Sequence, residues 1–142
     1  MSKGSLQGAL EDPAVKSWVS IMKAYRHIFS FLERELLQHG CGVSRFQILL
    51  ALYFEGALAP VQLAERMNVS RANITNFLKR LTEDGLVHAS NQSVKRPDYE
   101  LTKSGVSYFE EIFPVHIANI KKIVPIIPVE LSKVLDRVPE EG

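Results

Sequence analysis

The chain has 142 residues, 46% of them hydrophobic, and a formal net charge of +1. These values predict one domain with a sizeable core and exclude a uniformly basic protein that coats nucleic acid. The single cysteine, Cys41, excludes an internal disulfide and a zinc site built on several cysteines. No apolar run approaches the ~18 residues of a membrane span, and no signal-peptide segment follows Lys3, so we expect a cytoplasmic protein without a membrane partner.

Residues 1–11 are small, polar and glycine-containing, which predicts a mobile arm. Asp12 and Pro13 then form an N-cap followed by proline, and they predict a long helix that ends at Gly40. Its apolar residues recur at alternating steps of three and four: Val15, Trp18, Met22, Tyr25, Phe29, Leu32 and Leu36. A helix of this length extends beyond a compact unit, so we expect a second copy to cover it; a core helix of a single chain is the alternative.

After Gly40, a second helix is predicted up to Gly56. Ser44 and Gln47 have the spacing of a capping box, and Val43 and Ile48 have that of a hydrophobic staple.

Residues 63–81 predict a helix-turn-helix. Pro60 opens its first helix, whose inner face is formed by three residues: Leu63, Ala64 and Met67. Asn68 tolerates the left-handed conformation that often ends a helix, and Ser70 is a favourable N-cap for the second helix. The inward stripe of that second helix has the spacing of one helical face: Ile74, Phe77, Leu78 and Leu81.

The outer face of the second helix is polar and contains no acidic residue. Asparagine can pair with adenine, arginine or lysine with guanine and phosphate, and methyl groups with thymine. The candidate DNA-binding residues are therefore Ser70, Arg71, Ala72, Asn73, Thr75, Asn76, Lys79 and Arg80. The alternative is an ordinary helical hairpin with a solvated polar face.

Beyond Gly85, two short strands are predicted at 86–88 and 99–101, joined by a hairpin with a basic tip. Lys95 and Arg96 at that tip complete the candidate DNA-binding set. Between residues 70 and 97 five basic residues stand against two acidic ones, so this region is locally positive.

Thr102 is predicted to cap a last long helix that Pro114 bends. Its predicted inward positions are Val106, Phe109, Phe113, Ile117, Ile120 and Val124. Pro125 and Pro128 are expected to end it before a short helix over residues 129–138.

This order of elements resembles the MarR family of bacterial transcription regulators. The most specific matches are VSRANITNFLKRLTEDGLV (Val69–Val87), LTKSG (Leu101–Gly105), and Pro114 with His116. The resemblance implies a mainly α fold with a small β-hairpin wing.

The implied domain spans residues 1–142. Within it, a winged helix-turn-helix over residues 44–102 lies between long N- and C-terminal dimerisation helices, over 12–40 and 103–138.

The resemblance implies a DNA-binding regulator, expected to be a repressor, that binds a palindromic double-stranded operator as a homodimer. In many members a small, often aromatic or phenolic, molecule or an oxidant weakens the complex. We expect such an effector in the crevice between the long helices and the DNA-reading unit, near aromatic walls and a polar anchor: Trp18, Tyr25, His27, Arg45, Phe46 and Tyr53. The chain has no Gly-rich phosphate loop, nucleophile elbow or metal-ligand spacing of histidines, so no enzyme, cofactor or metal site is predicted.

The chain departs from the family pattern in three places. The short wing has Ser93 and Val94 where an acidic residue often precedes the tip arginine, and residues 88–90 replace a basic run. These two departures predict weak wing contacts and leave a second interpretation open, a winged-helix protein-interaction subunit without DNA binding. Ala59 stands where Ser or Thr usually caps the first helix of the motif, at a cost of about 1 kcal/mol.

A third interpretation is a thiol-based redox sensor through Cys41, because some family members sense peroxides with a thiol and His39 lies nearby. It is disfavoured, since the sensing cysteine of that branch lies early in the first helix and Cys41 lies beyond its end. His116 stands beside an apolar stripe, so we expect a hydrogen-bonded interface histidine there and no metal ligand.

Overall fold

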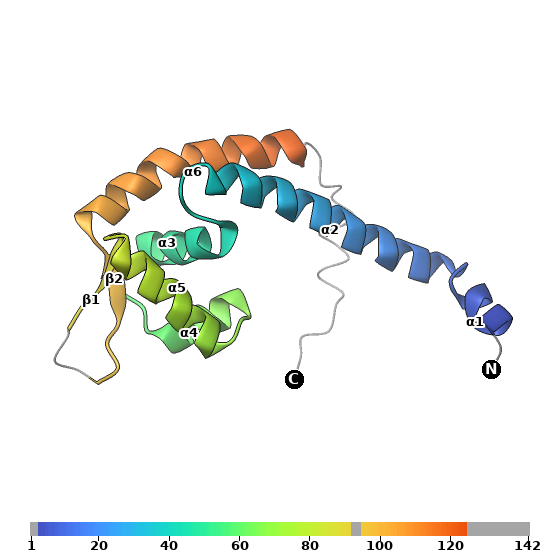
Figure 1. Cartoon of the computed structure of the whole chain (residues 1–142), viewed down its shortest axis with the longest axis horizontal. Coiled ribbons are helices and arrows are strands. Elements are labelled where there is room, and N and C mark those ends of the chain that lie inside the picture. Colours follow the sequence, from blue (N-terminus) through green and yellow to red (C-terminus); the bar gives the residue numbers. More distant parts are fainter. Residues whose placement is uncertain (1–2, 92–94, 125–142) are drawn as a thin grey trace.

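The computed structural model describes residues 3–91 and 95–124. Its elements in chain order are α1 (Lys3–Ala9), α2 (Pro13–Leu37), α3 (Val43–Glu55), α4 (Pro60–Met67), α5 (Arg71–Glu83), β1 (Val87–Ala89), β2 (Tyr99–Leu101) and α6 (Lys103–Ile123). A lobe of α3, α4, α5 and the hairpin lies on one side of α6, while the first half of α2 extends away from it (Figure 1). The predicted fold class is confirmed. None of the described helices is long and apolar enough to cross a membrane.

The long helix α2 begins where predicted. The Asp12 carboxylate accepts a hydrogen bond from the Ala14 N–H at 2.8 Å, and Pro13 fills the first helical position. The helix ends at Leu37, and Gly40 has a φ of +92°, which other residues rarely adopt. Part of the predicted arm forms the exposed helix α1, so residues 3–9 are not irregular, while the mobility of the arm stays a prediction.

Helix α3 begins earlier than predicted. Its N-cap is Gly42, and the Val43 N–H donates a hydrogen bond to Glu33 Oε2 of α2 at 3.1 Å. A side chain at position 42 would collide with that carboxylate. The predicted capping box of Ser44 and Gln47 is therefore wrong, because a carboxylate from another helix takes its place.

Helices α4 and α5 form the predicted helix-turn-helix. Asn68 adopts the left-handed conformation, with φ 54° and ψ 48°, and the Ser70 hydroxyl accepts a hydrogen bond from the Asn73 N–H at 3.2 Å. Ala59 offers no side-chain acceptor, but its N–H donates to Gln62 Oε1 at 2.8 Å. Half of the capping interaction is therefore kept.

The core lies where the lobe meets the end of α2 and the first half of α6. Its fully buried side chains are Phe46, Phe109, Leu36, Ile48, Leu49, Leu63, Ile74, Leu78, Leu81, Val87 and Cys41. The predicted inward stripe of α5 is confirmed, with Phe77 half-buried beside it.

Helix α6 starts at the predicted cap, where the Thr102 hydroxyl accepts a hydrogen bond from the Gly105 N–H at 2.9 Å. Its buried face is formed by Gly105, Phe109, Ile112 and His116. Most of the predicted stripe is only half-buried: Val106, Phe113, Ile117, Ile120 and Val124. The prediction combined two apolar faces, of which the chain covers one.

The helix α6 contains Pro114 and follows a curved path (Figure 1). The short helix predicted over residues 129–138, with Pro125 and Pro128 before it, lies outside the described residues.

The wing is a two-stranded antiparallel hairpin, with Val87 opposite Leu101. Leu58 adds a third segment that was not predicted. Its N–H donates to the Tyr99 carbonyl at 3.0 Å, and the Tyr99 N–H donates to the Leu58 carbonyl at 2.8 Å. The first residue of β2 is therefore bonded to the segment immediately before α4.

Candidate nucleic-acid interface

The outer face of the helix-turn-helix is exposed at every predicted position: Ser70, Arg71, Ala72, Asn73, Thr75, Asn76, Lys79 and Arg80. The buried stripe on the opposite side of α5 fixes the rotation of the helix, so this polar face points away from the lobe. The Thr75 hydroxyl donates to the Arg71 carbonyl at 2.9 Å. Towards a ligand, this hydroxyl therefore acts as an acceptor.

Five basic side chains belong to this surface: Arg71, Lys79, Arg80, Lys95 and Arg96. In the part of the chain that the structure describes, none of them forms an ion pair; the basic partners there are Lys16, Arg45, Arg66 and His88. Cations without an acidic partner are suited to phosphate oxygens.

A groove of about 320 Å³ separates α5 from the hairpin. Its walls are Ala59, Pro60, Val61, Arg71, Thr75, Lys95, Arg96, Pro97 and Tyr99. The fold thus places Arg71 and Thr75 of α5 opposite Lys95 and Arg96 of the hairpin. Three basic residues and no acidic one line the groove, so it suits an anionic backbone.

The base of the wing carries little net positive charge. His88 Nε2 lies 3.1 Å from Glu100 Oε1, and His88 Nδ1 lies 3.1 Å from the Ala89 carbonyl oxygen. The Glu100 carboxylate offsets any charge on the imidazole. The weak wing contacts inferred from the sequence stay a prediction that this pairing supports.

The residues predicted for an effector site do not come together. Trp18 and His27 are exposed on α2, while Phe46 is buried in the core. Arg45 forms an ion pair at the end of α5, and Tyr53 packs against a ring of α6. Within the described protomer these aromatic residues of α2 and α3 face different neighbours, and their grouping around an effector stays a prediction.

A cavity of about 360 Å³ does lie between the long helices and the lobe. Its walls are Tyr25, Ile28, Phe29, Leu32, Val43, Ser44, Gln47, Met67, Val69, His116 and Ile120. Tyr25 is the only one of the six predicted effector residues among them. The walls are mostly apolar with a few polar groups and no cation, as in sites for small neutral molecules.

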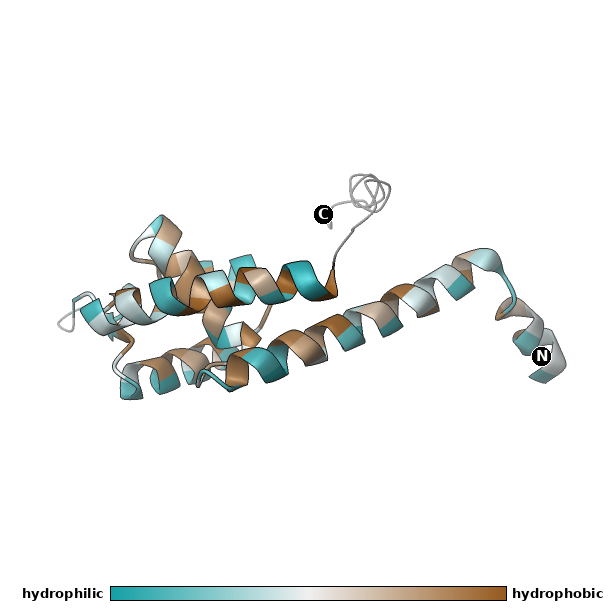
Figure 2. Cartoon of the chain, turned by 90° about the horizontal axis from the view of Figure 1, so that it is seen from above, coloured by the Kyte–Doolittle hydropathy of each residue, from teal (hydrophilic) through white to brown (hydrophobic). Residues whose placement is uncertain are grey.

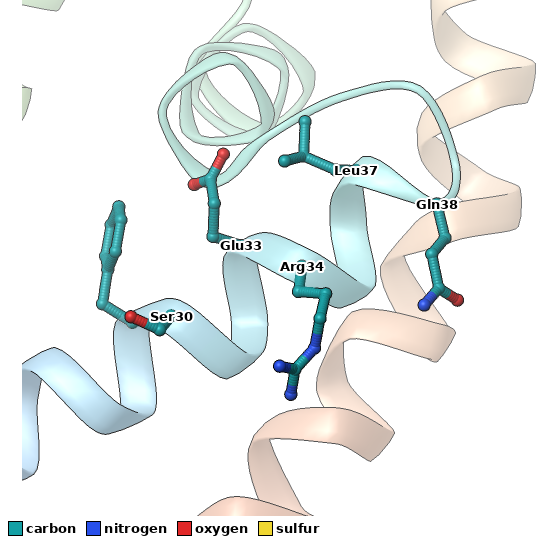
Figure 3. Close-up of a pocket in the computed structure, with 6 residues that line it drawn as sticks. Ser30, Glu33, Arg34, Leu37 and Gln38 are labelled. Carbon is teal, nitrogen blue, oxygen red and sulfur yellow. The ribbon is translucent and has the colours of Figure 1, made fainter.

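A second hollow, of about 500 Å³, lies on one face of α2 (Figure 3). Its lining residues are five residues of that helix and its C-cap: Phe29, Ser30, Glu33, Arg34, Leu37 and Gln38. It is a helix surface rather than an enclosed ligand site.

His116 borders the cavity from α6. Its ring is tilted against that of Phe46, with centroids 4.6 Å apart. Its Nδ1 is buried and has no hydrogen-bond partner among the described residues, so the predicted hydrogen bond is not found there. Burial lowers the pKa of His116, which favours the neutral imidazole. The sequence pattern singled out His116 as a histidine among apolar residues. It did not predict that the side chain is buried in the core of the protomer.

Cys41 is 1% exposed. Burial raises the pKa of its thiol to about 11, although Arg45 acts in the opposite direction. The thiolate is the reactive form, so this environment opposes the redox-sensor interpretation. Among the described residues, no group of three or more His, Cys, Asp or Glu side chains is placed to hold a metal ion.

A second helix whose exposed face carries no acid, beside a basic hairpin, defines a winged-helix DNA-binding protein. Residues 43–92 match the model of the MarR family. This match places the segment in the MarR family, whose members are transcription regulators and not enzymes.

Two curated relatives and two solved structures illustrate this membership. The chain is 22% identical over 123 residues to the HTH-type transcriptional regulator MhqR of Bacillus subtilis (strain 168), with 85% of each chain covered. It is 30% identical over 112 residues to the repressor YetL of the same organism. This alignment covers 76% of this chain and 65% of YetL.

Among solved structures, a mutant MarR from E. coli with operator DNA has a TM-score of 0.77 at 20% identity, over 92% of this chain and 99% of that one. The organohalide-sensing RdhR-CbdbA1625 regulator bound to 2,4-dichlorophenol has a TM-score of 0.74 at 24% identity, over 85% of this chain and 76% of that one. These two likenesses show the fold.

Proposed function

We propose that this regulator represses transcription by binding a palindromic operator as a homodimer, and that a small neutral aromatic molecule releases it. The DNA-binding part of the proposal rests on one observation. The face of α5 that carries no acid and the basic hairpin both line the 320 Å³ groove. Asn73, Thr75 and Asn76 are assigned to base edges, and Lys79, Arg80 and the wing cations to phosphates. Its DNA target places the regulator in the cytoplasm.

The division of roles can be tested on an operator selected from a random duplex pool. Asn76→Ala is expected to weaken operator binding by about 1–3 kcal/mol and to change binding to random DNA little. Arg96→Ala is expected to weaken both and to reduce the salt slope by about 1, because it removes a phosphate contact. Lys23→Ala, at an exposed position on α2, is the matched control for loss of one positive charge.

The deciding measurement is the operator-to-random affinity ratio at two salt concentrations. A ratio that collapses in Arg96→Ala and survives in Asn76→Ala would reverse the assigned roles. A wild-type protein that selects no operator would favour the protein-interaction subunit instead.

The dimer part rests on apolar surface that the chain does not cover itself. Trp18, Ile21, Tyr25 and Leu37 of α2 are all exposed. Hydrophobic residues continue along the part of α2 that extends beyond the other elements (Figure 2). Contiguous apolar surface of this kind is typical of an interface, and a second copy with the same seam is its natural partner.

The effector part rests on the 360 Å³ cavity beside His116. RdhR-CbdbA1625 was solved with 2,4-dichlorophenol, and we propose an effector of that class here. A phenol fits better than an aromatic acid, because the walls contain no cation and the imidazole is favoured in its neutral form.

Calorimetric titration with 2,4-dichlorophenol and with 2,4-dichlorobenzoate separates these ligands. We expect the phenol to bind and to weaken operator binding, and the benzoate to do neither. Val69→Phe, which fills the cavity from its wall, should block the phenol. Equal binding of both compounds, or binding that survives Val69→Phe, would contradict this site.

A further inference from the structure

The turn between α2 and α3 is held by one side chain of α6 and one of α3. The Tyr108 hydroxyl of α6 donates a hydrogen bond to the His39 carbonyl at 2.6 Å. Arg45 of α3 donates from Nη2 to the Gly40 carbonyl at 3.2 Å. These two side chains bind backbone oxygens that follow the end of α2, so the turn is fixed and not a free hinge.

Arg45 also contacts the end of α5, the second helix of the helix-turn-helix, which we call the recognition helix. Its Nη1 lies 3.2 Å from Asp84 Oδ2, and Asp84 is the C-cap of α5. The Arg45 side chain is only 14% exposed, so its conformation is restricted by packing. Because the guanidinium is planar and presents its donors as a rigid fork, one group sets the distance between Gly40 and Asp84.

The contacts of Arg45 with Gly40 and Asp84 form a bridge between the turn and α5. The start of α3 connects this bridge to the cavity. Val43 and Ser44 line the 360 Å³ cavity and directly precede Arg45. The Val43 N–H is held by Glu33 of α2, whose carboxylate points towards the start of α3 (Figure 3). A displacement of the first turn of α3 therefore acts on Arg45, and through Arg45 on the end of α5.

We infer that Arg45 is a positioning residue that fixes the recognition helix to the turn at the end of α2, so that operator affinity depends on this bridge. The inference rests on the proposed function and adds the route by which the long helices control the DNA-reading face.

Cys41 provides a built-in measurement of the turn. It is the only cysteine of the chain, lies next to Gly40, and is 1% exposed. A thiol reagent reaches it only when the turn opens. Arg45 lowers the pKa of this thiol, so loss of Arg45 alone would slow the reaction. Faster labelling of an Arg45 variant therefore reports opening of the turn and not electrostatics.

The experiment compares Arg45→Gln, Asp84→Ala, the double variant and Arg66→Gln. The last is the matched control, because it removes the same charge from another ion pair of the lobe, the one with Glu55. Each protein is measured for the labelling rate of Cys41 with a disulfide reagent and for operator affinity.

We expect Arg45→Gln to raise the labelling rate, and Arg45→Gln and Asp84→Ala each to lower operator affinity about three- to tenfold; Asp84 raises the pKa of the Cys41 thiol, so operator affinity is the deciding readout for Asp84→Ala. The double variant should resemble the single ones, because both remove the same bridge. Removal of the acid Asp84 would by charge alone strengthen DNA binding, so a loss of affinity there has to come from position.

The inference is overturned if Asp84→Ala labels and binds as the wild type does, or if Arg66→Gln changes both readouts equally. If the wild type binds no operator, the proposed function fails, and the labelling rate still decides whether Arg45 holds the turn. An unchanged rate in Arg45→Gln would then overturn that part as well.

Discussion

Replacing His116 by phenylalanine tests its buried Nδ1, which has no hydrogen-bond partner among the described residues. A buried polar group without a partner costs about 1–3 kcal/mol. Phenylalanine keeps a flat ring beside Phe46, and the adjoining cavity of about 360 Å³ accommodates its greater volume. We expect His116→Phe to stabilise the protein by about 1–2 kcal/mol, which at this chain length raises the Tm by about 3–6 °C.

The same variant changes the dependence of stability on pH. Burial lowers the pKa of His116 from its usual 6.5, so the unfolded chain binds the proton first as the pH falls. The stability of the wild type is therefore fully present above pH 6.5 and decreases below it, towards the depressed pKa. Phenylalanine takes up no proton, so the advantage of the variant should grow in acid.

Thermal unfolding at pH 8.0 and pH 5.5, at one protomer concentration, measures both effects. His27→Gln is the control, since His27 is exposed on α2. A variant that is less stable at pH 8.0 would mean that Nδ1 has a partner, such as an ordered water. A pH dependence equal to that of the wild type would refute the role of His116 in it.

Three further pairs of substitutions test the fold and the interface. Gly105→Ala should lower the free energy of unfolding by about 1–3 kcal/mol, because a Cβ at position 105 collides with the backbone carbonyl of Leu86. Gly8→Ala is the control, since a Cβ there meets no atom within 4 Å; equal denaturation curves of the two variants would contradict this. Ser70→Ala should cost about 1 kcal/mol of stability, while Ser70→Asp keeps the cap but weakens operator binding by adding a negative charge, and undiminished binding of Ser70→Asp would show that the position does not face DNA. Trp18→Asp should sediment as a folded monomer, and a dimeric Trp18→Asp would place the interface elsewhere. Leu36→Asp should instead prevent folding, because Leu36 is only 1% exposed in the protomer.

Local signals placed most helices correctly. Asp12, Ser70 and Thr102 each cap the helix predicted for them, because a cap depends on one side chain and the backbone of the next three residues. The exposed face of α5 was predictable for a similar reason, since one helical period separates its polar residues from its buried ones.

Features that depend on contact between distant elements were not predictable in this way. Glu33 caps α3 from ten positions away, which a capping box read along the chain cannot indicate. Leu58 pairs with Tyr99 through backbone groups, which carry no residue-specific signal. The walls of the cavity beside His116 were not predictable, because periodicity identifies the apolar faces of two helices but not which of them meet.

The bond between Leu58 and Tyr99 has a consequence for the kind of DNA that the regulator selects. Leu58 stands just before the helix-turn-helix and Tyr99 begins the returning strand of the wing, so two backbone hydrogen bonds connect the two parts that we propose to contact DNA. Their separation is then a property of the protein and not of the DNA. A duplex whose groove spacing differs from it has to bend or narrow, at an energy that depends on its sequence. We therefore expect the regulator to distinguish sites by the stiffness of base pairs that its side chains do not contact.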